Sequence, residues 1–209
     1  MKQNMLKVAV AMLSLSPLSH AANYAVSNNT GFGTNAYLTS SGDATLAGAF
    51  LGNFSINDGD IASISSSTDL VNSFNLYNTG GFNAPTPPLS LAGTFGVSGS
   101  VPVGSFNGSN IYLLSTDSRD IGSATEFGVV KLSNTFNVAD DANPNPIDIT
   151  LNAGAGTVLA GDFGVVQFAP SPLNPTGEND AFRTAQLVPE PSVALLGALG
   201  VLGLLRRRR

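Results

Sequence analysis

Short apolar runs separated by closely spaced turn signals are the feature of this 209-residue chain that most restricts its fold. Residues 147–151 (Ile-Asp-Ile-Thr-Leu) alternate between apolar and polar, as a strand with one solvated face does. No stretch of residues 22–188 shows a helical repeat longer than two turns. The turn signals include Asn57-Asp58-Gly59-Asp60, Gly80-Gly81, Asn107-Gly108 and the proline-rich segments 84–88 and 143–146.

These runs predict an all-β domain over residues 22–188, as a β-sandwich or jelly roll of roughly nine strands. We expect one helix on each side of it, an N-terminal signal helix and a C-terminal transmembrane helix. The expected strands lie at 46–54, 70–77, 89–97, 110–114, 126–132, 147–151, 157–159, 164–168 and 182–187.

The first 21 residues have the pattern of a secretory signal peptide, in which a basic start and an apolar run precede a small-residue cleavage site. The matching positions are Lys2, Lys7, the apolar run 6–15, Ser19, His20 and Ala21. We predict cleavage after Ala21, and removal of Ala22 as well is the nearby alternative. The pattern implies the Sec export machinery and signal peptidase as partners.

The C-terminal segment 189–209 has three parts in a fixed order. Pro189, Glu190 and Pro191 form an extended start, because proline fixes φ and donates no backbone hydrogen bond. Residues 192–205 are fourteen uncharged positions, a helix of roughly 21 Å that spans a membrane if the bilayer thins and the arginines snorkel. The basic cluster Arg206, Arg207, Arg208 and Arg209 then lies in the cytoplasm, so the body lies outside it. An amphipathic helix lying in the interface is the alternative.

This order of Pro-Glu-Pro, apolar helix and terminal arginines resembles the PEP-CTERM sorting signal of Gram-negative bacteria. The resemblance covers residues 189–209 and implies that a membrane-embedded exosortase removes the tail. It implies transient anchoring in the inner membrane, followed by release or attachment at the cell surface or in the extracellular matrix, near exopolysaccharide. A plain single-pass anchor is the alternative, although it has no need of Pro-Glu-Pro.

The body between the two signals is strongly acidic. Residues 22–188 carry thirteen acidic side chains against Arg119, Lys131 and Arg183, a net charge near −10. Such a surface repels nucleic acid and anionic lipid, so we expect neither as a partner of the body.

The missing residue types restrict the chemistry further. The chain has no Cys or Trp, and its one histidine, His20, lies in the predicted signal peptide. A Ser-His-Asp triad, a Cys-His pair and a His-ligated zinc site therefore cannot be built in the body. A carboxylate pair, a Ser-Lys dyad through Lys131 and a metal held by oxygen ligands remain open.

Two acidic pairs are the candidate metal ligands: Asp58 with Asp60, and Asp140 with Asp141. Oxygen ligands suit calcium, which extracellular modules bind at roughly 10⁻⁴ to 10⁻³ M. No complete EF-hand loop surrounds either pair, so the hypothesis is weak calcium binding. The alternative is that the pairs form a turn and a solvated loop. No other cofactor is expected.

Three classes of function remain open. The leading expectation is a non-enzymatic structural or adhesive protein of the cell surface or matrix, because the sorting signal is present and common catalytic residue types are missing. A carbohydrate-binding surface module is the alternative, although the body has no Trp to offer a sugar. A carboxylate-dependent hydrolase that uses Asp117 and Asp120 is the third class, with a local ion pair to Arg119 as the simpler interpretation.

Overall fold

A computed structural model describes residues 21–28, 36–42, 45–82, 94–143, 145–151, 156–167 and 178–187. The predicted signal peptide, apart from Ala21, lies outside these residues, and so does the whole predicted sorting signal 189–209. Within the described part of the chain, no helix is both long and apolar enough to cross a membrane.

The described body is an all-β structure, as expected. The strands are β1 (Ala22–Ser27), β2 (Ala36–Leu38), β3 (Gly48–Phe54), β4 (Phe74–Phe82), β5 (Phe95–Val97), β6 (Ser100–Val101), β7 (Asn110–Thr116), β8 (Glu126–Thr135), β9 (Ile147–Thr150), β10 (Gly156–Ala160), β11 (Asp162–Gln167), β12 (Glu178–Arg183) and β13 (Ala185–Gln186). The helices are α1 (Asp58–Ile61) and α2 (Ser67–Ser73), with the 3₁₀ turns η1 (Gly104–Phe106), η2 (Ile121–Ser123) and η3 (Val138–Ala142).

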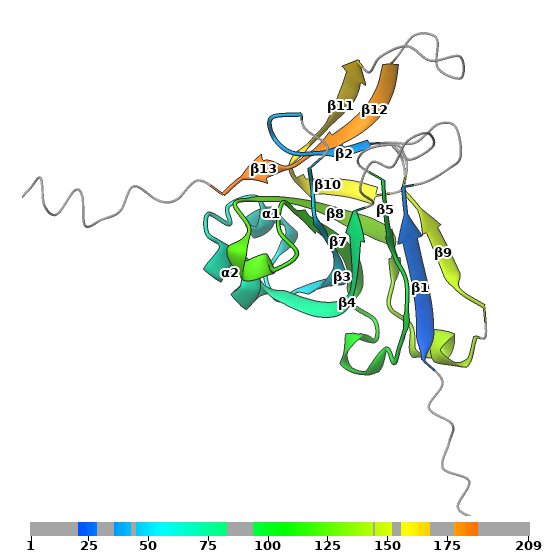
Figure 1. Cartoon of the computed structure of the whole chain (residues 1–209). Coiled ribbons are helices and arrows are strands. Elements are labelled where there is room, and N and C mark those ends of the chain that lie inside the picture. The colour runs from blue at the N-terminus through cyan, green and yellow to red at the C-terminus, as the bar shows by residue number, and fades with distance from the viewer. Residues whose placement is uncertain are drawn as a thin grey trace, which may run out of the picture.

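A large, mainly antiparallel sheet organises the body. Its strand order is β10-β8-β7-β3-β4-β5-β1-β6, with β13 paired to β8 and β9 paired in parallel to β1. A smaller sheet has the order β11-β12-β2, in which β12 and β2 are parallel. In Figure 1 the helices α1 and α2 lie to one side of the curved strands β3, β4, β7 and β8, and β1 runs beside β9.

The central strands are buried on both faces, which divides the core into two clusters. On β7, Ile111 and Leu113 point into one cluster, while Tyr112 and Leu114 point into the other. The first cluster is shared with β1, β5 and β12, and the second is covered by α1 and α2 through Ile61 and Leu70. Side chains alternate across a strand, so one apolar run can supply both faces of this sheet.

Several predicted strands are confirmed by the structure. Strands β3, β7, β9 and β10 begin and end within two residues of the expected segments, and β8 begins at Glu126 as expected but ends three residues later than expected, at Thr135. Strand β9 is exposed at Asp148 and Thr150 and buried at Ile149, as the alternation at 147–151 predicts. Strands β1, β2 and β6 were not predicted, and the expected strand at 182–187 is wrong, because it is divided between the end of β12 and the short strand β13.

The expected strand at 70–77 is wrong in its first half, because residues 67–73 form α2. Ser66 caps that helix by accepting a hydrogen bond from the Asp69 backbone N–H at 3.1 Å. The Ser66 hydroxyl in turn donates to the Asp69 carboxylate at 2.6 Å. This local capping stabilises a helical start that the apolar pattern does not reveal.

Two expected turns are also different in the structure. Asn57-Asp58-Gly59-Asp60 begins the one-turn helix α1, and Gly80-Gly81 lies inside β4. A Cβ atom at Gly80 would lie 2.3 Å from the Gly96 carbonyl oxygen. The glycine at that position therefore permits the close approach of β5 to β4, and it does not form a turn.

Candidate functional site

A shallow hollow lies where α1 meets the ends of β3 and β7. Its volume is about 550 Å³, within the range of pockets that hold small ligands. The residues around it are mostly polar and include several amides. Its main side chains are Asn53, Phe54, Ile56, Asn57, Asp58, Asn110 and Tyr112.

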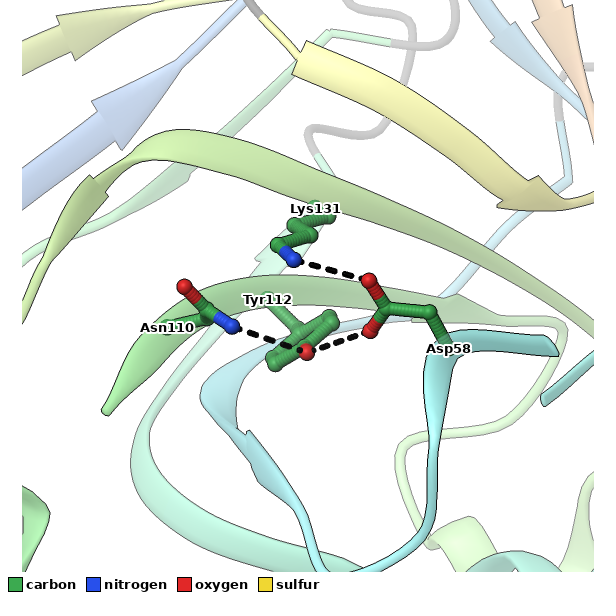
Figure 2. A network of polar contacts seen from close by, with 4 residues as sticks. All are labelled: Asp58, Asn110, Tyr112 and Lys131. Carbon is green, nitrogen blue, oxygen red and sulfur yellow. Dashed lines mark hydrogen bonds and ion pairs between the residues drawn. The ribbon is translucent and has the colours of Figure 1, made fainter. Parts of the chain in front are cut away.

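A network of polar contacts joins three residues that line the hollow, Asp58, Asn110 and Tyr112, to Lys131 (Figure 2). The Lys131 ammonium of β8 donates to Asp58 Oδ2 at 2.7 Å, and the Tyr112 hydroxyl of β7 donates to Asp58 Oδ1 at 2.7 Å. The Asn110 amide lies 3.5 Å from the same hydroxyl oxygen, and the Lys131 ammonium lies 6.0 Å from the Tyr112 ring centroid. These contacts attach the start of α1 to the sheet.

The alternation of β7 and β8 explains why these side chains meet. Tyr112 and Lys131 are paired across the two strands, so their side chains leave the same face of the sheet. Helix α1 covers that face and places Asp58 between the two. The loop that the sequence marks as acidic therefore provides a single carboxylate to a site built mainly by the strands.

The contacts among Asp58, Lys131 and Tyr112 shift the pKa of each of these three side chains. The hydrogen bonds from Lys131 and then from Tyr112 hold the pKa of Asp58 below its usual range. The hydrogen bond to Asp58 raises the pKa of Lys131, and burial followed by that same carboxylate raises the pKa of Tyr112. At neutral pH the site therefore presents a carboxylate, an ammonium and a neutral phenol.

This protonation pattern suits binding better than proton transfer. A lysine held as an ammonium cannot serve as the base of a Ser-Lys dyad, because a base must first be neutral. Amide, carboxylate, ammonium and phenol groups together offer both donors and acceptors to a ligand rich in hydroxyls.

The other predicted metal ligands have separate partners. The Asp60 carboxylate lies 3.3 Å from the amide nitrogen of Asn57, which precedes α1 and donates to it. Asp140 and Asp141 belong to η3, which packs against β1. Among the described residues no three acidic side chains come together in a way that could hold a metal ion. Asp58, Asp60, Asp140 and Asp141 thus do not form one cluster.

The carboxylates considered for hydrolysis serve as hydrogen-bond acceptors in local turns. Asp120 accepts from the Gly122 N–H at 3.1 Å and from the Ser123 hydroxyl at 2.7 Å. Asp117 accepts from the Thr125 N–H at 2.9 Å, from the Thr125 hydroxyl, and from the Glu126 N–H at 3.1 Å. Burial raises the pKa of Asp117, but these hydrogen bonds outweigh it and the pKa is lowered.

Sequence reasoning did not place Tyr112, Asn110 or Lys131 in a site with Asp58. One signal was present, since Lys131 is a single charge inside an apolar strand, and such a charge usually has a partner. Comparison with family models, curated proteins and solved structures finds no match to this chain. The case for a function therefore rests on the residues themselves.

Proposed function

We propose that this chain is an exported, non-enzymatic structural or adhesive protein of the bacterial cell surface or exopolysaccharide matrix. The observation that carries the proposal is the pair of terminal signals, 1–21 and 189–209, on either side of an acidic all-β body. The finer fold assignment belongs to the same proposal: a β-sandwich or jelly roll flanked by a signal helix and a transmembrane helix. Two apolar clusters on opposite faces of the main sheet support it.

In this proposal the chain passes through the Sec machinery and is cut by signal peptidase. The apolar segment 192–205 then holds it in the inner membrane of a Gram-negative bacterium until an exosortase recognises Pro189-Glu190-Pro191 and removes the tail. The use of Asp117 and Asp120 within turns supports a non-enzymatic role over the carboxylate-dependent hydrolase. Hydrolysis of matrix polysaccharide, lost when either aspartate is changed to asparagine, would reverse that preference.

The intact mass of the protein isolated from its native cells tests the proposal. We expect a dominant form that starts at Ala22 or Asn23 and ends before Ser192. A matched variant with Pro189→Ala and Pro191→Ala should keep its tail and stay in the membrane, since it changes the motif but neither the apolar helix nor the arginines. A dominant wild-type form that still contains the arginine cluster would favour a plain anchor.

The hollow beside Asp58 favours carbohydrate binding as the second candidate function. Asparagine amides, the Asp58–Lys131 pair and the Tyr112 hydroxyl line or border it, and these groups can bond sugar hydroxyls in both directions. Glycan-array binding by the exported protein tests this candidate. Binding should be lost with Asn110→Ala and retained with Asn145→Ala, a change in an exposed amide of the 143–146 segment. An array without any signal would leave only the structural role.

A further inference from the structure

The first residue of β1 is held at its backbone nitrogen by an aspartate far away in sequence. The Ala22 nitrogen lies 2.9 Å from Asp141 Oδ1, and the Ala22 side chain is fully buried. The same carboxylate oxygen accepts from the Val103 N–H at 3.0 Å. Asp141 therefore joins η3 to the start of β1 and to the segment that follows β6.

Among the residues that the structure describes, the surroundings of this contact are acidic and carry no positive side chain. Asp140 Oδ2 accepts from the Tyr24 hydroxyl at 2.6 Å, and the Tyr77 hydroxyl lies 3.3 Å from the Ala22 carbonyl oxygen. In the part of the chain that the structure describes, the one ion pair within 4 Å is Lys131 with Asp58, so no lysine or arginine neutralises Asp140 or Asp141. The two carboxylates lie where a cation at the Ala22 nitrogen would be stabilised.

We propose that cleavage after Ala21 turns the Ala22 nitrogen into an α-ammonium that forms an ion pair with Asp141, so that removal of the leader stabilises the folded body. This inference rests on the proposed export and goes beyond it. Water is added across the Ala21–Ala22 peptide bond. Its oxygen joins the Ala21 carbonyl carbon as a carboxylate, and the Ala22 nitrogen becomes an amine that is protonated at neutral pH.

The geometry also selects between the two cleavage positions. Ala22 pairs with Val101 at the start of the β1–β6 ladder, and its carbonyl oxygen accepts from the Tyr77 hydroxyl. Cleavage after Ala22 would remove these contacts together with the nitrogen held by Asp141. Because Ala22 is buried in the folded body, signal peptidase must cut before β1 docks, and the new terminus then enters the site.

The ionisable groups that face the Ala22 nitrogen are Asp140 and Asp141 from η3, Tyr24 from β1 and Tyr77 from β4. Two of the four are carboxylates. Among the described residues no lysine or arginine lies within 4 Å of either carboxylate, so none of these residues competes with the new ammonium for Asp141.

A cycle of four exported full-length chains tests the proposal. Two are allowed to lose the leader, and two carry Ser19→Gln and Ala21→Gln, which block cleavage. Asp141→Asn is placed in one of each kind. Urea unfolding is followed by pulse proteolysis at pH 6.5. Asp148→Asn, which removes one charge from β9 beside Ala25 of β1, is the matched control.

In the processed protein at pH 6.5, Asp141→Asn should lower the folded-to-unfolded ratio about 5- to 30-fold more than in the uncleaved protein. Asp148→Asn should show no such excess. A purely structural hydrogen bond to the Ala22 nitrogen would cost the same in the cleaved and the uncleaved chains.

The possible failures are distinguishable. An N-terminal peptide that starts at Ala22, with equal losses in cleaved and uncleaved chains, overturns the ion pair and leaves export intact. A terminus at Asn23 also overturns it, because the paired nitrogen is gone. A protein that keeps residues 1–21 overturns the proposed export as well.

Discussion

At the scale of single residues, several carboxylates of this acidic body accept hydrogen bonds from groups that lie far away in sequence. Asp58 accepts from Tyr112 and Lys131, and Asp141 accepts from Ala22 and Val103. A charged acceptor forms stronger hydrogen bonds than a neutral one. The acidic composition thus contributes to the internal structure as well as to the surface charge.

Changing Asp58 to asparagine should lower the free energy of unfolding by about 0.5–1 kcal/mol at pH 7. The value is small because the side chains of Asp58 and Lys131 are 40% and 28% exposed, so water screens the pair. Since the pKa of Asp58 is lowered in the folded state, its contribution is present above the unfolded value of about 3.9 and is lost as pH falls through the folded value. Urea unfolding at pH 7 and pH 3 measures both effects.

Asp60→Asn is the matched control for that experiment, because it removes the same charge from the same short helix. Asp60 contacts Asn57 and lies outside the network of Figure 2. Equal losses for the two variants at pH 7 would contradict a specific role for the Asp58 pair.

Glu126 is the second residue for which we expect a measurable effect. Its carboxylate accepts from the Ser40 N–H, the Ser40 hydroxyl and the Thr184 hydroxyl, each at 2.7 Å. Burial raises the pKa of Glu126, but these hydrogen bonds outweigh it and the pKa is lowered. Glu126→Gln places an amide where donors already point, so it should cost about 1–3 kcal/mol in urea unfolding at neutral pH. The exposed Asp162→Asn is the control, and an equal effect there would show that only net charge matters.

At the scale of elements, β7 and β8 determine the architecture because they supply both core clusters. Val130 and Leu132 of β8 join one cluster, and Phe127 and Val129 join the other. Gly128, which lies between Phe127 and Val129, permits the close approach of a ring from the second sheet. A Cβ atom there would lie 2.3 Å from Cε1 and 2.6 Å from Cζ of the Phe182 ring on β12.

Gly128→Ala should therefore destabilise the protein by about 1–3 kcal/mol through overpacking against Phe182. Gly164→Ala on β11 is a matched control, because a Cβ atom there meets nothing within 4 Å. We expect that variant to be neutral or slightly stabilising, since alanine reduces the freedom of the unfolded chain. Thermal unfolding of both variants provides the comparison, and an unaffected Gly128→Ala protein would argue against the tight packing of β8 on β12.

The elements also show what can be inferred from the sequence. Strands β7, β8 and β9 were predictable because they carry an apolar run or a strict alternation. Helix α2 was not, because its helical start depends on capping by Ser66 while its apolar residues also fit a strand. Strands β2 and β6 have three and two residues, too few for any period to be visible.

The candidate site was only partly predictable for a related reason. Asp58 stands out within an acidic turn sequence, but Lys131 lies 73 positions and Tyr112 54 positions further along the chain. Their meeting depends on strand register and on the docking of α1, which are tertiary properties. The contact between Ala22 and Asp141 spans 119 positions and depends on the same kind of information.

At the scale of the whole molecule, the net charge and the internal ion pairs have opposite effects on the stability of the folded state. A body near −10 repels itself, which opposes the compact state and favours any bound cation. Lys131 and, in our proposal, the Ala22 ammonium each neutralise one carboxylate. Within the described part of the body, most acidic side chains have no lysine or arginine within 4 Å, so the ionic composition of the medium should affect the stability of the body.

Calcium should therefore stabilise the exported protein, with Asp58, Asp60, Asp140 and Asp141 as the predicted ligands. At about 100 times the dissociation constant, binding adds about 2.7 kcal/mol to the free energy of unfolding. For a chain of this size that corresponds to a rise in Tm of roughly 5–11 °C.

The measurement compares Tm in calcium chloride and in sodium chloride of equal ionic strength, because screening alone also helps a self-repelling body. Combined Asp60→Asn and Asp140→Asn should reduce the calcium-specific rise, whereas Asp148→Asn, which removes a charge from outside the two pairs, should not. Asp60 and Asp140 are the better choice because Asp58 already binds Lys131, and Asp141 holds the Ala22 nitrogen. Equal Tm values in the two salts would leave the four aspartates with their hydrogen-bonding roles alone.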